Sequence, residues 1–249
     1  MPAPDFILIG TQKGGTTSLY NLLVQHPQIH KAARKEVHYF DQYYENGFDW
    51  YCAQFPALAP GHITGEASPF YMAHPRVAER IAHDCPHTRL IVMLRNPADR
   101  AISHYEQEFR RQHDTADLAK ALADEEQRTA KDWAALAAGA LLTRSNAQRF
   151  SYRQRGYYAR QLQPYFDRFP RQQLFVLQSE TFFTQPLDIL PNLYHFLGVD
   201  PAFRPTDWSV RKPGHYEKSQ YDALYRELMQ HYEPENETLF ALLGERYDW

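Results

Sequence analysis

The sequence predicts an α/β protein in which helices flank a central parallel sheet. Three short apolar segments have the composition of buried strands: residues 6–9, 90–94 and 174–177. A stretch with helical spacing of apolar residues follows each of them, and strands that alternate with helices favour a parallel sheet. The 249 residues are 43% hydrophobic, which is enough for a sizeable core. We therefore expect a single domain over residues 1–249.

The first strand runs into a glycine-rich loop, and a helix is expected from Thr16 onward. Such a loop aims backbone N–H groups and the positive end of the helix dipole at one point, which favours a bound phosphate. Gly10 and Gly15 are spaced as in the triphosphatase loop G-x-x-x-x-G-K-[ST], but Thr16 stands at the lysine position and Lys13 lies inside the loop. The residues that such a loop needs to hold a γ-phosphate with magnesium are therefore incomplete here. The other interpretation is a tight turn without a ligand.

A second unit combines the strand at 90–94 with a helix that begins at Asn96 and Pro97, a good N-cap and first helical residue. Arg95 stands at the C-terminal end of this strand, where open α/β sheets bind ligands. Its guanidinium suits a phosphate, and Ser103 on the helix adds a hydroxyl. Taken singly, Arg95 fits a surface arginine and Ser103 a serine bonded to its own backbone.

The remaining segments complete the expected α/β order. A strand is expected at 62–66, and amphipathic helices are expected at 157–169 and at 186–198, the latter closed by a glycine. Between the second and third units, Ala-rich residues at about 114–148 predict one or two helices inserted on the sheet. A loop rich in Pro, Trp and Arg follows at 201–216, and two short helices are expected after it.

Composition argues against several classes of partner. The formal net charge of −3 gives no reason to expect nucleic-acid binding. No stretch reaches the roughly 18 apolar residues of a membrane span, so we expect no membrane contact. Cys52 and Cys85 fit buried thiols in a reducing compartment, which predicts a cytoplasmic protein. The histidines lack metal-ligand spacing, so no metal is expected.

Three segments carry a family resemblance: "GTQKGGTTSLYNLLVQHPQI", "KEVHYFD" and "LRNPADRAISHY". In this order they resemble the sulfotransferases that use 3′-phosphoadenosine 5′-phosphosulfate (PAPS), especially the heparan sulfate branch. The resemblance covers nearly the whole chain, with the helical insert matching least. It implies the P-loop-kinase-like sulfotransferase fold, PAPS as cosubstrate, the bisphosphate nucleotide PAP as product, and no metal.

The resemblance also implies a nucleotide site. Lys13 would stabilise the leaving 5′-phosphate, while Arg95 and Ser103 would hold the 3′-phosphate. Trp208 would stack on adenine, although the late loop lacks the cysteines that often flank it in animal members. The residues expected to bind the nucleotide are Lys13, Gly14, Gly15, Thr16, Thr17, Arg95, Ser103, Trp208, Arg211, Lys212 and Gly214.

The segment "KEVHYFD" supplies a general base. In the heparan sulfate branch the glutamate of a K-E-x-H-x-F-D segment takes the acceptor proton, and by position this is Glu36. His38 is the alternative, because imidazole has the more suitable ordinary pKa. We favour Glu36, since a carboxylate beside cations can be tuned by its surroundings. His38 and Asp41 are then expected to bind substrate or orient Glu36, and Lys35 either faces the cleft or is solvated.

Further residues have two interpretations each. Glu66 and Ser68 lie near donor and acceptor in the family, or form a turn with a capping serine. The segment at Arg153, Gly156 and Tyr157 lies near the nucleotide, or simply begins a helix. Arg100 fits an exposed helical arginine or a structural ion pair.

The sequence therefore predicts an enzyme that moves a sulfuryl group from PAPS to an acceptor hydroxyl or amine by in-line transfer. The alternatives are a P-loop nucleotide kinase or NTPase and a catalytically inactive nucleotide-binding scaffold. The acceptor is a glycan, a small hydroxylated metabolite or a carrier-bound chain. The apolar helices of the insert suggest a roof over a small or lipophilic acceptor.

Overall fold

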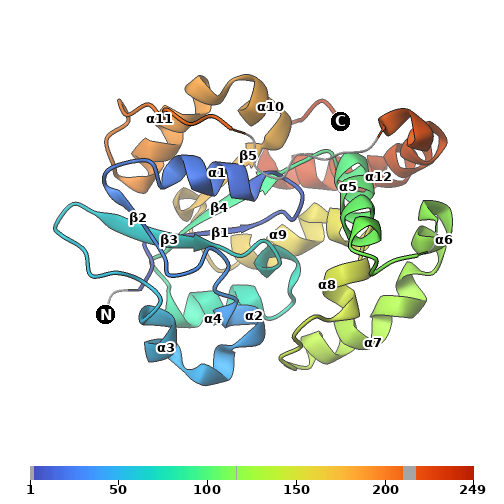
Figure 1. Ribbon diagram of the computed structural model, residues 1–249, viewed down its shortest axis with the longest axis horizontal. Helices are drawn as coiled ribbons and strands as arrows, with labels where there is room; N and C mark the ends of the chain where they lie inside the picture. The colour runs from blue at the N-terminus through green and yellow to red at the C-terminus, as the bar shows by residue number, and fades with distance from the viewer. Residues whose placement is uncertain (1–2, 116, 210–216) are drawn as a thin grey trace.

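A five-stranded parallel sheet in the order β2-β3-β1-β4-β5 lies at the centre of the protein (Figure 1). The structure is a computed structural model that describes residues 3–115, 117–209 and 217–249. Its strands are β1 (Phe6–Gly10), β2 (Ile29–Lys31), β3 (Ile63–Ala67), β4 (Arg89–Leu94) and β5 (Leu174–Gln178). The strands expected at 6–9, 62–66, 90–94 and 174–177 are β1, β3, β4 and β5, which confirms the predicted parallel sheet.

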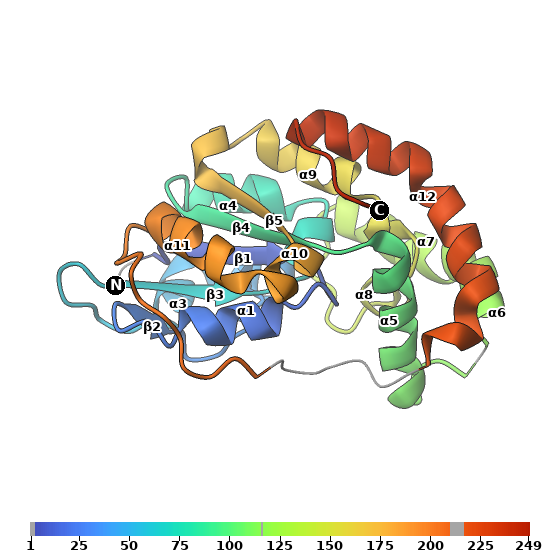
Figure 2. The ribbon, with the colours of Figure 1, turned by 90° about the horizontal axis from the view of Figure 1, so that it is seen from above.

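Helices cover both faces of this sheet (Figures 1 and 2). One face carries α1 (Thr16–Leu23), α10 (Ser179–Thr184) and α11 (Pro186–Leu197). The other carries α2 (Tyr39–Gln42), α3 (Phe48–Cys52), α4 (Val77–Asp84) and α9 (Tyr158–Phe166). The predicted layering of helices around the sheet is confirmed.

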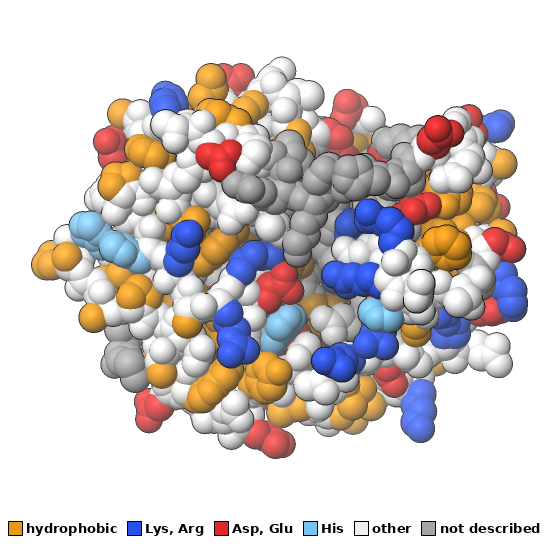
Figure 3. Space-filling view, viewed as in Figure 1, with side chains coloured by type: hydrophobic (Ala, Val, Ile, Leu, Met, Phe, Trp, Pro, Cys, Tyr) orange, Lys and Arg blue, Asp and Glu red, His pale blue; other side chains and the backbone are white. Residues whose placement is uncertain are grey.

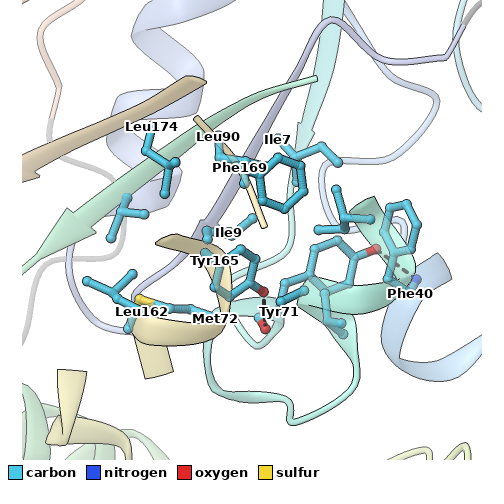
Figure 4. Packing of buried hydrophobic residues seen from close by; sticks show 14 of the residues in the cluster. Ile7, Ile9, Phe40, Tyr71, Met72, Leu90, Leu162, Tyr165, Phe169 and Leu174 are labelled. Atoms are coloured by element: carbon cyan, nitrogen blue, oxygen red, sulfur yellow. Dashed lines mark hydrogen bonds between the residues drawn. The ribbon is translucent and has the colours of Figure 1, made fainter. Parts of the chain in front are cut away.

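Strand β1 shows why the sheet is buried on both sides. Phe6 and Leu8 point into the cluster under α1 and α11, while Ile7 and Ile9 point into the cluster under α4 and α9. All four side chains are 0% exposed. Alternate residues of a strand face opposite sides, so a strand between two helical layers is apolar throughout. In the second cluster, Tyr165 also donates a hydrogen bond to the Tyr71 carbonyl oxygen at 2.7 Å (Figure 4).

A group of helices stands beside the sheet, next to the carboxyl ends of its strands (Figure 1). Helix α5 (Pro97–Arg110) follows β4 directly, and α12 (Asp222–Leu243) packs on α5 and α9. The insert, for which one or two helices were predicted, contains α6 (Leu118–Ala123), α7 (Glu125–Ala137) and the start of α8 (Asn146–Phe150), one helix more than expected. A small core of Phe70, Leu136 and Ala147 joins the insert to the segment after β3.

The structure also differs from the predicted elements at the C-terminus and in several short elements. The expected pair of short C-terminal helices is wrong, because a short 3-10 turn at 218–221 leads into the 22-residue helix α12. Pro234 lies inside α12, where proline usually interrupts a helix. Strand β2 and helices α2 to α4 were not predicted, since each is eight residues or shorter.

Candidate functional site

A cleft of about 700 Å³ opens at the carboxyl ends of the strands. Residues after all five strands line it, together with one side of α5 and residues of the insert. Figure 3 shows a hollow near the middle of this face, with Lys and Arg side chains gathered on both sides. The predicted site residues that line the cleft are Lys13, Gly14, Gly15, Thr16, Thr17, Glu36, His38, Arg95 and Ser103.

The loop after β1 is shaped by backbone that favours glycine. Gly15, the N-cap of α1, has φ of 98°, and Lys13 also has a positive φ of 69°. A Cβ on Gly14 would lie 2.7 Å from the carbonyl oxygen of Met93. No side chain caps the first turn of α1, so its first N–H groups stay available to an anion. The Lys13 ammonium donates to Gln107 Oε1 at 3.1 Å.

Arg95 joins β4 to this loop. Its Nη1 donates to the carbonyl oxygen of Lys13 at 3.1 Å, and its Nη2 lies 3.9 Å from a carboxylate oxygen of Asp99. Asn96 accepts hydrogen bonds from the first turn of α5, which confirms the predicted cap. Ser103 lies two turns along the same helix, 3% exposed. Arg95 and Ser103 thus reach the cleft from one strand–helix unit.

Glu36 and His38 belong to a chain of charged contacts. Lys35 Nζ lies 2.7 Å from Glu36 Oε1 and 3.1 Å from Thr17 Oγ1, so it connects Glu36 to the start of α1. On the other side, Glu36 Oε2 lies 3.4 Å from His38 Nε2. His38 Nδ1 lies 2.9 Å from a carboxylate oxygen of Asp41, which is 1% exposed behind it.

These contacts set the charge of both candidate bases. Burial alone would raise the pKa of Glu36, but the neighbouring His38 and Lys35 outweigh it and lower the pKa to about 2. Burial would lower the pKa of His38, yet hydrogen bonds to Asp41 and Glu36 raise it to about 10. Near neutral pH, Glu36 is therefore an ionised acceptor and His38 holds its proton.

Glu66 holds the segment of Glu36 and His38 in place through buried hydrogen bonds. It is 0% exposed, and its burial raises the pKa of its carboxyl group. Four donors serve the carboxylate: the Val37 N–H and the hydroxyls of Ser68, Tyr51 and Tyr71. Ser68 Oγ also accepts the N–H of His38, whose φ is 58°. Glu66 and Ser68 therefore position the backbone that carries Glu36 and His38, and neither lines the cleft.

Several cleft residues were not predicted. Gln107 and Arg111 follow Asp99 and Ser103 at four-residue intervals, so helical spacing along α5 was the signal that would have found them. Phe183, 40% exposed, lies against Gly15. Its contact depends on tertiary packing and had no sequence signal. The insert and its flanks add His113, Arg144, Gln148, Arg149 and Arg155.

Other predicted residues lie elsewhere. Trp208 is 39% exposed and does not line the cleft, while Arg211, Lys212 and Gly214 fall outside the described residues. Arg153 donates to the Leu122 carbonyl oxygen at 2.7 Å. Gly156 packs on Tyr232, and Tyr157 lines a separate pocket. Arg100 is neither exposed nor ion-paired in the described chain, because it is 0% exposed and donates to the carbonyl oxygen of Tyr152.

The described residues hold neither a cluster of metal ligands nor a membrane-spanning helix. No group of three or more His, Cys, Asp or Glu side chains there is arranged to hold a metal ion. Within the same ranges, no helix has the length and apolar character needed to cross a membrane.

The chain matches the family described as "Sulfotransferase domain" over residues 3–232. It is 26% identical over 318 aligned residues to "Membrane-associated sulfotransferase kil1" of Dictyostelium discoideum, and 29% identical over 269 to "Heparan sulfate glucosamine 3-O-sulfotransferase 3B1" of Mus musculus. Both alignments cover 99% of this chain, which spans 66% and 65% of the lengths of these relatives. The crystal structure of a sulfotransferase from Alicyclobacillus acidocaldarius superimposes with a TM-score of 0.81 at 30% identity, covering 99% of this chain and 98% of that one.

Proposed function

Because the chain belongs to the sulfotransferase domain family, we propose that it transfers a sulfuryl group from PAPS to an acceptor hydroxyl or amine. The observation that carries the proposal is the contact of Lys35 with both Thr17 of the phosphate loop and Glu36. This contact joins the glycine-rich loop after β1 to the Glu36 carboxylate within one cleft. Sulfuryl transfer needs a site for the leaving phosphate and a proton acceptor close to each other.

The residues of the loop fit the 5′-phosphosulfate of PAPS, which supplies the activated sulfuryl group. The uncapped N–H groups at the start of α1, with the hydroxyls of Thr16 and Thr17, would hold its 5′-phosphate. Lys13 Nζ would neutralise the charge that grows on the oxygen leaving sulfur. Gln107 holds that ammonium in the cleft before any ligand binds.

Arg95 and Ser103 would hold the 3′-phosphate, the group that distinguishes PAPS from other adenine nucleotides. The guanidinium is anchored on the Lys13 carbonyl and is 22% exposed, which leaves donors for a phosphate. Phe183, beside Gly15, offers an exposed ring on which the adenine can stack. We assign this role to Phe183 instead of Trp208, because Phe183 lines the cleft and Trp208 does not.

We assign the general base to Glu36. A base must be unprotonated before it takes the proton of the acceptor. Glu36 meets this condition near neutral pH, and His38 does not, because its contacts with Asp41 and Glu36 raise its pKa to about 10. His38 instead orients Glu36, since its Nε2 lies 3.4 Å from Oε2 of that residue.

The acceptor we propose is an anionic glycan. Basic side chains at the C-terminal end of α5 and in the insert line the cleft: Arg111, Arg144 and Arg149. A cleft with several arginines on one side suits an acceptor that carries carboxylates or sulfates. The hypothesis of an apolar roof loses support, because the insert brings arginines into the cleft.

Binding of PAP distinguishes this function from the kinase alternative. The loop has no lysine directly after Gly15, so ATP with magnesium lacks its usual partner. We expect PAP without magnesium to raise the melting temperature and ATP with magnesium to leave it unchanged. The reverse result would favour a kinase or NTPase. The cytoplasmic location stays a prediction, and the Dictyostelium relative is named a membrane-associated protein.

A further inference from the structure

Two fully buried arginines lie next to the cleft. Arg100, on α5, is 0% exposed, and Arg155, in the 3-10 turn at Gln154–Gly156, is 2% exposed. The hydrogen-bond acceptors of both guanidinium groups among the described residues are carbonyl oxygens and the side-chain amide of Gln12, and the Arg155 guanidinium also lies over the Phe70 ring, 5.0 Å from its centroid. No carboxylate is among these partners. Buried charges are normally paired with an opposite charge, so this arrangement needs an explanation.

Arg155 lines the cleft itself. Its Nη1 donates to the amide oxygen of Gln12 and, at 3.2 Å, to the carbonyl oxygen of Gln148. Its Nη2 donates to the carbonyl oxygen of Pro69 at 3.4 Å. A guanidinium has five N–H groups, and these contacts use three of them. The side chain is held in place, and two of its N–H groups take no part in these hydrogen bonds.

The partners of Arg155 belong to two segments of the site, the loop that carries Lys13 and the segment that follows Glu66 and Ser68. Gln12 precedes Lys13 in the phosphate loop, and Pro69 follows the Glu66–Ser68 platform that holds the Glu36 segment. The Glu36 carboxylate acts on Arg155 electrostatically, favouring its charged form. Lys13, Glu36 and Arg155 therefore line one cleft.

A second layer of positive charge lies behind Arg155. Arg100 donates through Nη2 to the carbonyl oxygen of Tyr152, but its Nε and Nη1 have no partner in the described part of the chain. His104, one turn further along α5 and 0% exposed, has no partner there for either ring nitrogen. Burial, with Arg155 and Arg100 nearby, lowers the pKa of His104 well below its ordinary value, so this ring is neutral.

Two like charges in a dry environment repel each other and lose hydration. Burial, with Arg100 beside it, lowers the pKa of Arg155 to about 9, and the group is still charged at neutral pH. An anion in the cleft offsets both costs. Charges fixed in advance in such an environment stabilise a developing negative charge far better than charges in water.

We propose that Arg155 is a further catalytic residue, which contacts the non-bridging oxygens of the sulfuryl group during transfer, with Arg100 as a positioning residue behind it. The inference rests on the proposed function. In the step concerned, the acceptor oxygen or nitrogen forms a bond to sulfur, and the bond from sulfur to the 5′-phosphate oxygen breaks. That oxygen keeps the electron pair, and Glu36 takes the acceptor proton. Arg155 stays protonated throughout.

The test compares Arg155→Met with Arg155→Lys and with Arg153→Met as a matched control. Arg153 lies two residues away, contacts Leu122 and Glu125, and does not line the cleft. We expect kcat to fall by about 10²-fold or more in Arg155→Met. Arg155→Lys keeps the positive charge but lacks the planar guanidinium with its paired N–H donors, so its kcat should fall less than that of Arg155→Met. The Kd for PAP, which lacks the sulfuryl group, should stay within about twofold of wild type in both variants.

The outcomes separate this inference from the function on which it rests. Wild-type protein that binds PAP but transfers no sulfuryl group would overturn the proposed function. Turnover by Arg155→Met within about threefold of wild type would overturn only the role of Arg155. Equal losses of kcat and PAP affinity would make Arg155 a structural tie between Gln12 and Pro69. A fall in kcat of the same size in Arg153→Met would also refute the assignment.

Discussion

The identity of the base predicts a specific response of the rate to pH. In the free enzyme, the contacts with His38 and Lys35 outweigh burial and hold the pKa of Glu36 at about 2, while the contacts with Asp41 and Glu36 hold the pKa of His38 at about 10. Between about pH 6 and pH 9, Glu36 is therefore ionised in nearly every molecule. If Glu36 is the base, we expect kcat/KM to vary by no more than about twofold over this range.

The alternative gives a very different profile. A group with a pKa near 10 is neutral in about one molecule in 10³ at pH 7, and the neutral fraction rises about tenfold for each pH unit up to that pKa. If His38 were the base, kcat/KM would rise by nearly 10³-fold from about pH 6 to pH 9. The two assignments thus differ by nearly three orders of magnitude over a range in which most proteins stay folded.

The assay follows initial transfer of labelled sulfuryl from PAPS at low acceptor concentration, in wild type and Glu36→Gln. We expect kcat/KM of the variant to be about 10²- to 10⁴-fold lower than that of wild type at every pH, while its calorimetric affinity for PAP stays the same. Glu45→Gln, a substitution at an exposed glutamate, is the matched control and should leave the rate unchanged. A steep rise with pH in wild type, or a large loss of PAP affinity in Glu36→Gln, would refute the assignment of Glu36.

Three further predictions test other parts of the site. Lys13→Ala should lower both the transfer rate and the calorimetric affinity for PAP, because Lys13 is assigned to the leaving phosphate, and an unimpaired rate would contradict that role. Glu66→Ala leaves four buried donors without their acceptor, so it should lower the free energy of unfolding in urea by about 3 kcal/mol or more. A decrease below about 1 kcal/mol would refute the role of Glu66 in holding the segment of Glu36 and His38. The double substitution Arg111→Ser and Arg149→Ser should raise KM for a sulfated glycan and make that KM less dependent on salt, while KM for PAPS stays within about twofold of wild type. An unchanged KM for the glycan would exclude these two arginines from acceptor binding.

The features closest to the phosphate loop could be predicted from the sequence because they are local. The strand before Gly10, the cap at Asn96 and the position of Arg95 depend on residues within a few positions of one another, and patterns of apolar spacing and capping report such relations directly. The pairing of Glu36 with His38 was also visible, since the two lie two residues apart.

Contacts between distant segments could not be read from the pattern. Arg155 reaches Gln12 across more than half of the chain, and nothing near either residue signals the other. Trp208 was expected to stack on adenine because of the family resemblance of the late loop, and Phe183 was not singled out. Only the packing of α10 against the loop after β1 puts Phe183 in the cleft. The insert looked apolar in composition, and only its packing shows that Arg144 and Arg149 face the site.

The most direct test of the account is transfer of labelled sulfuryl from PAPS to a glycan rich in carboxylates and sulfates, without added metal. We expect wild-type protein to label this glycan and Glu36→Gln, which still binds PAP, to leave it unlabelled. Wild-type protein that binds PAP yet labels no acceptor, or Glu36→Gln that labels as fast as wild type, would contradict it.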